Sequence, residues 1–189
     1  MPAKVLVISD YRDYHSVRPE AEVFTSLAQL GFDITIMTYG TAAYAEQFKA
    51  AGIKVIDFHP EKKFSKTEIG RIRQELERGK YDILQLFNSK AIINGIQAAK
   101  GLPVKIVLYR GYSGNVHWWD PTAYFKFLHP SVDKIWCNSI GVERMFHRQL
   151  FFKKSKAITI NKGHRLEWYV DTKPADLTAF GVPKGAFTI

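Results

Sequence analysis

Short apolar runs alternate with helix-like segments along the whole chain, and this alternation constrains the fold more than any other feature. The first run, residues 4–10, is nearly continuous in Val, Leu and Ile, which is typical of a strand covered on both faces. A helix is predicted to follow over residues 19–31. Pro19 suits its first turn, and Glu20 and Glu22 suit its positive end. Further strands are predicted at residues 33–39, 54–59, 82–87, 104–111, 134–139 and 156–161.

The segments between these strands carry helix signals. Thr41 is the predicted cap of a helix over residues 41–52. Ser65 and Glu68 have the spacing of a capping box at the start of another helix, which ends at Gly79. Two more helices are predicted at about residues 89–100 and 140–152. Alternating strands and helices predict an α/β fold, a Rossmann-like, doubly wound parallel sheet of about seven strands in three layers, α/β/α.

Composition limits the class of protein. The 189 residues, 46% of them apolar, suffice for one good core, and the longest apolar runs are far shorter than the roughly 20 residues of a membrane-spanning helix. The first residues run directly into a strand, so we expect no signal peptide and a cytoplasmic location. Cys137 is the single cysteine, which excludes an internal disulfide, and the six histidines lack paired ligand spacing. No metal and no cofactor are therefore predicted.

Ligands of such sheets bind beyond the carboxyl ends of the strands, so the loops there are the predicted site. The first loop has no glycine to bring backbone close to a phosphate, and offers aromatic and basic side chains instead. Its candidate substrate-binding residues are Tyr11, Arg12, His15 and Arg18. The alternative is a solvated loop in which Arg18 pairs with Glu22 across a helical turn.

Residues 109–121 form the stretch richest in chemically useful side chains. Aromatic rings here could stack on a sugar, while a guanidinium or an imidazole could contact phosphate or an acceptor hydroxyl. The candidates are Arg110, Tyr112, His117 and Trp118. The alternative is that Trp118 and Trp119 bury the loop, and we expect one of the two to be structural.

Asn138 and Ser139 stand where the sixth strand meets a helix. A helix N-cap is the favoured interpretation, and a polar contact to a ligand from the same helix end is the alternative. Both residues are therefore kept among the substrate-binding candidates.

Two segments mix aromatic with basic residues, namely residues 59–66 and 146–156. They could make a peripheral contact with an anionic membrane. The favoured alternative is a solvated helix flank whose lysine stems lie along apolar surface. The net charge of +9 favours anionic partners in general and does not choose among them.

The stretches KVLVISD near the start, VDKIWCNS before a helix and AITINKG after it resemble the group 1 retaining glycosyltransferases of the GT-B class. The likeness spans almost the whole chain. In that family the first of two Rossmann-like domains mainly binds the acceptor, and the second holds most of the nucleotide-sugar site, including a Glu-x7-Glu pair. That spacing does not occur in this sequence. The resemblance therefore implies an N-terminal, acceptor-side domain over residues 1–165, followed by a linker and the start of a donor domain over residues 166–189.

The function that this resemblance implies is transfer of a sugar from a nucleotide-sugar donor to a glycan or lipid-linked acceptor, with retention of the anomeric configuration. The donor would be held mainly by the second domain, so this chain alone is expected to be inactive. The alternative is a stand-alone Rossmann-like or flavodoxin-like module that binds a small ligand. A nucleic-acid binder lacks any recognisable motif here, and no nucleic-acid partner is predicted.

Overall fold

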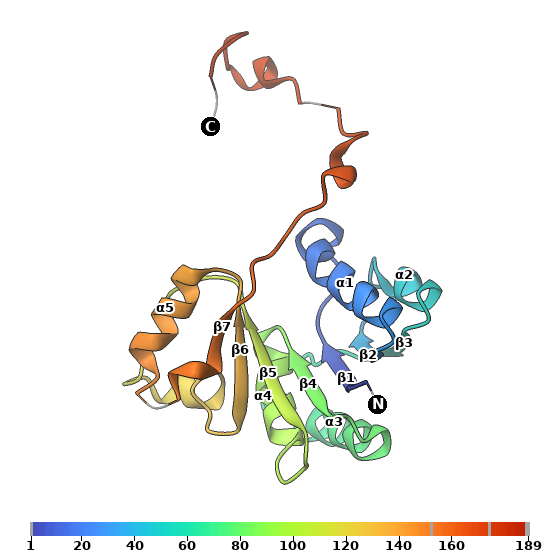
Figure 1. The fold of residues 1–189 in the computed structure, drawn as a ribbon, viewed down its shortest axis with the longest axis vertical. Coiled ribbons are helices and arrows are strands. Elements are labelled where there is room, and N and C mark those ends of the chain that lie inside the picture. The colour runs from blue at the N-terminus through green and yellow to red at the C-terminus, as the bar shows by residue number, and fades with distance from the viewer. Residues whose placement is uncertain (1, 152, 174, 188–189) are drawn as a thin grey trace.

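The computed structural model describes residues 2–151, 153–173 and 175–187. Its centre is a seven-stranded sheet in the order β3-β2-β1-β4-β5-β6-β7, in which every neighbouring pair is parallel (Figure 1). The predicted fold class is thereby confirmed. The strands are β1 (Lys4–Ile8), β2 (Asp33–Thr38), β3 (Lys54–Asp57), β4 (Ile83–Leu86), β5 (Lys105–Arg110), β6 (Val132–Cys137) and β7 (Ala157–Thr159).

Helices cover both faces of the sheet, as the three-layer prediction requires. The α-helices are α1 (Tyr14–Gln29), α2 (Ala45–Ala50), α3 (Lys66–Gly79), α4 (Ser89–Ala98) and α5 (Ile140–Gln149). Alternate residues of β1 point to opposite sides, so Val5 and Val7 pack with α1 and α2, whereas Leu6 and Ile8 pack in the larger core under α3, α4 and α5. Each side of the sheet therefore has its own apolar core.

The first helix begins earlier than predicted. Asp13 caps it by accepting hydrogen bonds from the backbone amides of His15 (3.1 Å) and Ser16 (3.5 Å). Pro19 consequently lies beyond the first turn, where it lacks the N–H that would bond the carbonyl of His15. Glu20 does not lie at the positive end of the helix either. The signal that decides the start is the aspartate cap, which outweighs the proline.

The other predicted caps have mixed outcomes. Ser65 caps α3 through the amide of Glu68 (3.4 Å), and Ser139 caps α5, both as predicted. The Glu68 carboxylate does not complete the box, because it accepts from the amides of Glu61 (3.0 Å) and Lys62 (3.2 Å). The prediction that Thr41 caps the second helix is wrong. A turn intervenes, and α2 begins four residues later without a side-chain cap.

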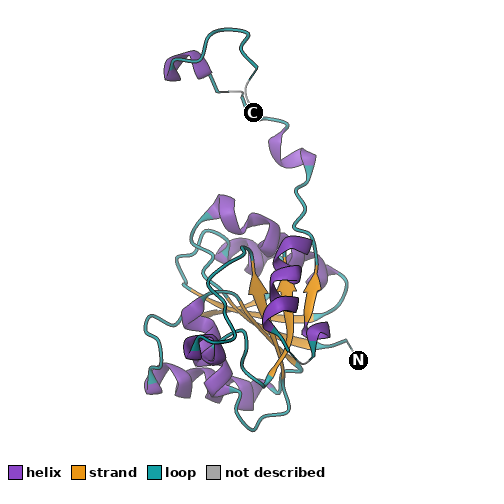
Figure 2. Cartoon of the chain, turned by 90° about the vertical axis from the view of Figure 1, so that its left-hand side faces the viewer, coloured by secondary structure: helices purple, strands orange, loops and turns teal. Residues whose placement is uncertain are grey.

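Beyond β7 the chain leaves the carboxyl edge of the sheet and extends away from the domain (Figure 2). This part holds two short 3-10 helices, η3 (Leu166–Tyr169) and η4 (Leu177–Phe180), and two more, η1 (Pro121–Phe125) and η2 (Lys154–Lys156), precede β7. By its sequence, the final stretch AFTI, residues 186–189, is predicted to begin a further strand. No strand is formed at residues 186–187, and residues 188–189 lie outside the described residues. Within the described chain no helix combines the length and the apolar character needed to cross a membrane.

Candidate functional site

The order of the strands along the chain reverses between β1 and β4, which are neighbours in the sheet. After β1 the chain enters α1 on one face, and after β4 it enters α4 on the opposite face, although β1 and β4 are neighbours. Loops that leave a sheet in opposite directions leave room for a ligand between them. The side chains that lie beyond the carboxyl ends of strands β1 to β4 are therefore the leading candidates for a ligand site.

A hydrogen-bonded chain of four side chains crosses this edge. Asn88, the N-cap of α4, lies 2.7 Å through Nδ2 from Nε2 of His59. Nδ1 of His59 lies 3.2 Å from the hydroxyl of Tyr39, and that hydroxyl donates to Glu61 (2.7 Å). Loops after β2, β3 and β4 are thereby tied together.

The partners set the protonation state of the imidazole. Asn88 Oδ1 accepts from the amide of Ala91, so its Nδ2 must donate to Nε2 of His59. The hydroxyl of Tyr39 gives its proton to Glu61 and is free to accept from Nδ1 of His59. Burial lowers the pKa of His59. The ring is therefore neutral, with its proton on Nδ1.

Arg12 is held at the rim of this cluster. Its guanidinium donates to both carboxylate oxygens of Asp10 (2.9 and 2.7 Å) and lies 4.1 Å above the ring of Tyr39. The Arg12 hydrogen bond lowers the pKa of Asp10. Because 57% of the Arg12 side chain stays exposed, the guanidinium is fixed in position and still open to an anionic ligand.

The other candidates from the first loop are separated by the structure. Tyr11 belongs to the core, with no exposed surface, and packs edge-on against Phe48. His15 is exposed in the first turn of α1. The guanidinium of Arg18 lies 4.5 Å from the ring of Trp168, and no ion pair between Arg18 and Glu22 occurs in the described part of the chain.

Arg110 builds the loop after β5 from within. Its Nε donates to the carbonyl of Tyr112 (2.8 Å) and its Nη2 to that of Gly114 (2.5 Å), while the guanidinium stacks on the Tyr112 ring at 3.7 Å. Asn138 assists by donating to the carbonyl of Gly111 (2.8 Å). Arg110 is 7% exposed, and Ser139 is engaged as the α5 cap. These residues shape the loop, and Tyr112 keeps an exposed ring.

The rings further along this loop remain at the surface. His117 stacks on Trp119 with centroids 5.0 Å apart and planes 9° from parallel. The backbone amide of Trp118 donates a hydrogen bond to the side chain of Gln149 (2.9 Å), and the indole ring of Trp118 contacts the ring of Phe151 edge-on. Trp118 is 50% and Trp119 66% exposed, so the expectation that one of them is buried as a structural residue is wrong. The backbone of the loop is anchored while both indoles stay accessible.

Lys162, just after β7, ties the end of the sheet to α1. Its ammonium lies 2.9 Å from the Glu20 carboxylate, donates to the carbonyl of Ser16 (3.2 Å) and lies 5.8 Å from the ring centre of Tyr109. Burial raises the pKa of Glu20, and the lysine opposes that shift. Sequence reasoning missed this pair, because nothing local signals a contact between a helix and a loop so far apart in the chain.

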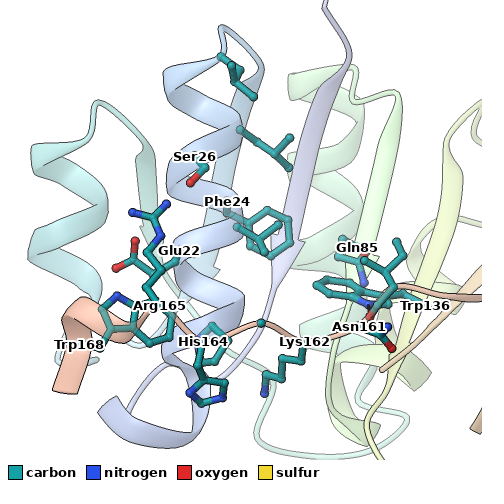
Figure 3. Close-up of a pocket in the computed structure, with 16 residues that line it drawn as sticks. Glu22, Phe24, Ser26, Gln85, Trp136, Asn161, Lys162, His164, Arg165 and Trp168 are labelled. Atoms are coloured by element: carbon teal, nitrogen blue, oxygen red, sulfur yellow. Dashed lines mark hydrogen bonds between the residues drawn. The ribbon is translucent and has the colours of Figure 1, made fainter. Parts of the chain in front are cut away.

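A groove of about 550 Å³ lies between α1 and the segment after β7 (Figure 3). Its apolar walls include Val23 and Leu27 of α1 and Leu30 just after that helix, and Trp136 lies opposite. Gln85 reaches it with a side-chain amide nitrogen that has no hydrogen-bond partner in the described structure. Basic and aromatic residues border its other end, namely Lys162, His164, Arg165 and Trp168.

Within the described residues, no three His, Cys, Asp or Glu side chains come together as potential metal ligands. Cys137 is buried in β6, and burial raises its pKa to about 11.

The sequence profile of Glycosyltransferase Family 4 matches residues 21–168, which is most of the chain. The chain belongs to Glycosyltransferase Family 4. A comparison with curated proteins gives no match.

Several solved structures share the fold of this family 4 chain. A glycosyltransferase from Rickettsia africae matches with a TM-score of 0.69 and 14% identity over 97% of this chain and 51% of its own. Anabaena HepE, solved with UDP and glucose, matches with a TM-score of 0.63 and 13% identity over 94% and 49%. MurG from Acinetobacter baumannii matches with a TM-score of 0.57 and 14% identity over 86% and 46%. The chain spans about half of each, and the resemblance to an N-terminal GT-B domain is confirmed.

Proposed function

We propose that this domain forms the acceptor-side half of a glycosyltransferase that moves a sugar from a nucleotide-sugar donor to a glycan or lipid-linked acceptor with retention. The observation that carries the proposal is the cluster at the switch point of the sheet. There an exposed guanidinium, Arg12, is fixed by Asp10 and Tyr39 beside the start of α1. HepE, which has this fold, binds UDP and a sugar, and this supports a nucleotide-sugar as the donor.

Each exposed group has a defined role in this proposal. Arg12 and His15 face the departing diphosphate, where a fixed cation stabilises the negative charge that develops as the sugar leaves. The stacked His117 and Trp119, with Trp118 and Tyr112, offer rings to the acceptor, because sugar faces pack well on aromatic surfaces. Catalysis then rests on positioning and on charge stabilisation, without a covalent role for this domain.

The domain boundary follows from the same proposal. Residues 1–165 form the Rossmann-like domain, and residues 166–189 form the linker towards a donor-binding domain. The chain after Tyr169 extends away from the sheet edge at which the site is proposed, as a connection to a facing domain would. The cytoplasm is the proposed location, and no nucleic-acid partner is proposed.

The test is turnover by the protein expressed from its whole reading frame, assayed with a panel of nucleotide-sugars and analysed for the configuration of the product. Arg12→Ala is expected to lower kcat/KM about tenfold to a hundredfold, the size of a lost charged contact to a phosphate. Lys100→Ala, which removes an exposed cation just beyond the end of α4, is the matched control and should leave the rate unchanged. A kcat/KM of Arg12→Ala equal to that of the wild type would contradict the proposed role of the switch-point cluster.

A stand-alone ligand-binding module is the second candidate, and the groove beside α1 favours it. Its walls are apolar, and the side-chain amide nitrogen of Gln85, which has no hydrogen-bond partner among the described residues, offers one polar contact. Two results together would favour this alternative. The chain would bind a small ligand saturably, and the protein expressed from the complete reading frame would transfer no sugar.

A further inference from the structure

The helix α1 contains a proline one turn after its start. Pro19 has no amide hydrogen, so the carbonyl of His15 lacks the hydrogen bond that a helix would otherwise give it. A proline inside a helix is a common cause of a bend, because one bond of the ladder is missing there. We call residues 14–18 the first turn of α1. This turn is joined to the rest of the helix less firmly than an uninterrupted turn would be.

One side of the first turn rests on a flat contact. The ring of Tyr14 stacks on that of Tyr44, the residue just before α2, with centroids 4.9 Å apart and planes 10° from parallel. Two parallel rings keep their contact when one of them slides over the other. The stack therefore supports the first turn without fixing its position along the rings.

The chain after β7 holds the first turn from another side. Nζ of Lys162 donates to the carbonyl of Ser16 (3.2 Å) in the first turn and lies 2.9 Å from the carboxylate of Glu20, beyond the proline. One ammonium thus joins the two sides of the missing bond. Because Glu20 is buried, solvent and salt screen this ion pair less than an exposed one. Lys162 is therefore the fixed point of the attachment.

A second contact from the same segment is of a different kind. The guanidinium of Arg18 lies 4.5 Å from the ring centre of Trp168 and 5.5 Å from that of Tyr14. Its Nε is buried and has no hydrogen-bond partner among the described residues. A cation held over the face of a ring is attracted without the strict geometry of a hydrogen bond. The contact between Arg18 and Trp168 can therefore break and re-form while Lys162 stays in place.

The segment that makes both contacts ends where the chain leaves the domain. We call residues 162–169 the strap, and Figure 3 shows Lys162, His164 and Trp168 of the strap beside α1. Nδ1 of His164 lies 2.5 Å from the hydroxyl of Tyr169, and its ring contacts that of Trp168. After Tyr169, the hydrogen bonds within the described chain join only near neighbours in sequence. A movement of the chain beyond the strap would therefore reach α1 through Trp168.

The two groups proposed to face the departing diphosphate differ in how they are held. Arg12 is fixed from outside α1, because Asp10 and Tyr39 lie after β1 and β2. His15 belongs to the first turn of α1 and moves with it. The position of His15 relative to Arg12 therefore depends on where the first turn lies.

We propose that the strap is a conformational device that sets this position. Trp168, by resting on Arg18, holds the first turn where His15 faces the same anion as Arg12. Release of Trp168 frees the first turn and separates the two groups. The inference rests on the proposed function for what Arg12 and His15 bind, and adds a way for the chain after β7 to control them.

The first test uses the chain itself and needs no sugar donor. Hydrogen-exchange mass spectrometry compares peptides covering residues 12–19 with peptides covering residues 21–29. In Trp168→Ala, exchange over 12–19 is expected to be about threefold to tenfold faster, the effect of losing one cation–π contact, and exchange over 21–29 should stay as in the wild type. Trp168→Tyr keeps a ring for Arg18 and should keep the slow exchange. Phe180→Ala, which removes a ring that is 80% exposed beyond the strap, is the matched control.

A double variant shows whether the two residues act through their contact. Arg18→Met should accelerate exchange over residues 12–19 as Trp168→Ala does. The double variant should exchange no faster than either single variant, because a contact that is already broken cannot be lost twice. Circular dichroism verifies that every variant is folded. Multiplication of the two single effects in the double variant would contradict a direct contact.

The second test measures sugar transfer by the protein expressed from its whole reading frame. Trp168→Ala should lower kcat about threefold to tenfold and leave KM for the nucleotide-sugar unchanged, because a misplaced His15 fails to stabilise charge that develops only as the sugar leaves. Trp168→Tyr should restore kcat, and Phe180→Ala should have the kcat of the wild type.

Three results would overturn the proposal. The first is unchanged exchange over residues 12–19 in Trp168→Ala. The second is equal acceleration over 12–19 and 21–29, which would indicate a loss of stability of the whole helix. The third is faster exchange over 12–19 with an unchanged kcat in a protein that transfers sugar. Absence of transfer by the wild type would instead contradict the proposed function, and the exchange measurements would still decide whether the strap holds the first turn.

Discussion

Asn88 donates a hydrogen bond to Nε2 of His59 over 2.7 Å, and through it the cap of α4 determines the protonation of a histidine in the loop after β3. A second proton on that nitrogen would face the amide hydrogens of Asn88 and find no acceptor. The neutral imidazole is thus the form that the folded protein selects. Four predictions follow from this and from the other buried contacts.

The first prediction concerns pH. Burial lowers the pKa of His59 in the folded state, reinforced by Arg12 and Lys90 and opposed by Asp10 and Glu61. The unfolded chain therefore binds a proton at a higher pH, close to about 6.5, than the folded chain does. The contribution of His59 to stability is complete above about pH 6.5 and is lost as the pH falls towards its lower folded pKa.

Urea denaturation at a series of pH values between neutral and mildly acidic measures this loss. His59→Asn has no group that titrates there and should show a smaller decline in the free energy of unfolding. An identical pH dependence of wild type and His59→Asn would show that other groups control the acid limb.

The second prediction replaces the hydrogen-bond donor at position 88 by an acceptor. Asn88→Asp keeps an oxygen for the amide of Ala91, and so keeps the cap, but it places a carboxylate next to Nε2 of His59. A carboxylate accepts a hydrogen bond from a protonated Nε2 and so stabilises the charged imidazolium. The pKa of His59 should therefore rise above its wild-type value. Titration of the imidazole by NMR measures the shift. A pKa that stays the same or falls in Asn88→Asp would contradict the assigned hydrogen-bond direction.

The third prediction concerns the ion pair between Glu20 and Lys162. Lys162→Met keeps the stem but leaves a carboxylate that is 8% exposed without its cation. The free energy of unfolding should fall by about 2 kcal/mol or more, less than for a fully buried pair because the lysine is 24% exposed. Chemical denaturation measures the loss.

Two variants serve as comparisons for this pair. Glu20→Gln removes the buried charge itself and should lower the free energy of unfolding less than Lys162→Met does. Lys49→Met breaks an ion pair whose members are 54% and 83% exposed, and should change stability by less than about 1 kcal/mol. Equal effects of Lys162→Met and Lys49→Met would mean that burial of Glu20 does not matter.

The fourth prediction concerns Arg110. Arg110→Met has a similar length but removes the donors to the carbonyls of Tyr112 and Gly114. Stability should fall by about 1–3 kcal/mol, and amide exchange should accelerate in the segment after β5 first. Hydrogen-exchange mass spectrometry resolves that segment. Arg148→Met, at an exposed position of α5, is the control, and faster exchange spread evenly over the chain would argue against a local role for Arg110.

Local sequence was sufficient for the architecture. Continuous Val, Leu and Ile runs separated by capped helices favour a parallel sheet covered on both faces, and all seven strands predicted between residues 4 and 161 are present. Ser65 and Ser139 were identifiable as caps for the same reason, since a cap acts on amides only two or three residues away. The start of α1 was misplaced because two local signals, Asp13 and Pro19, compete there.

Only the tertiary structure decided which polar residues share a site. His59, Tyr39 and Asn88 lie after three different strands, and their contact depends on the order of those strands in the sheet. Arg110 and Tyr11 read as ligand contacts in the sequence, yet burial assigns one to holding a loop and the other to the core. Sequence encodes periodicity and capping over short distances, whereas burial and long-range pairing exist only once the chain has packed.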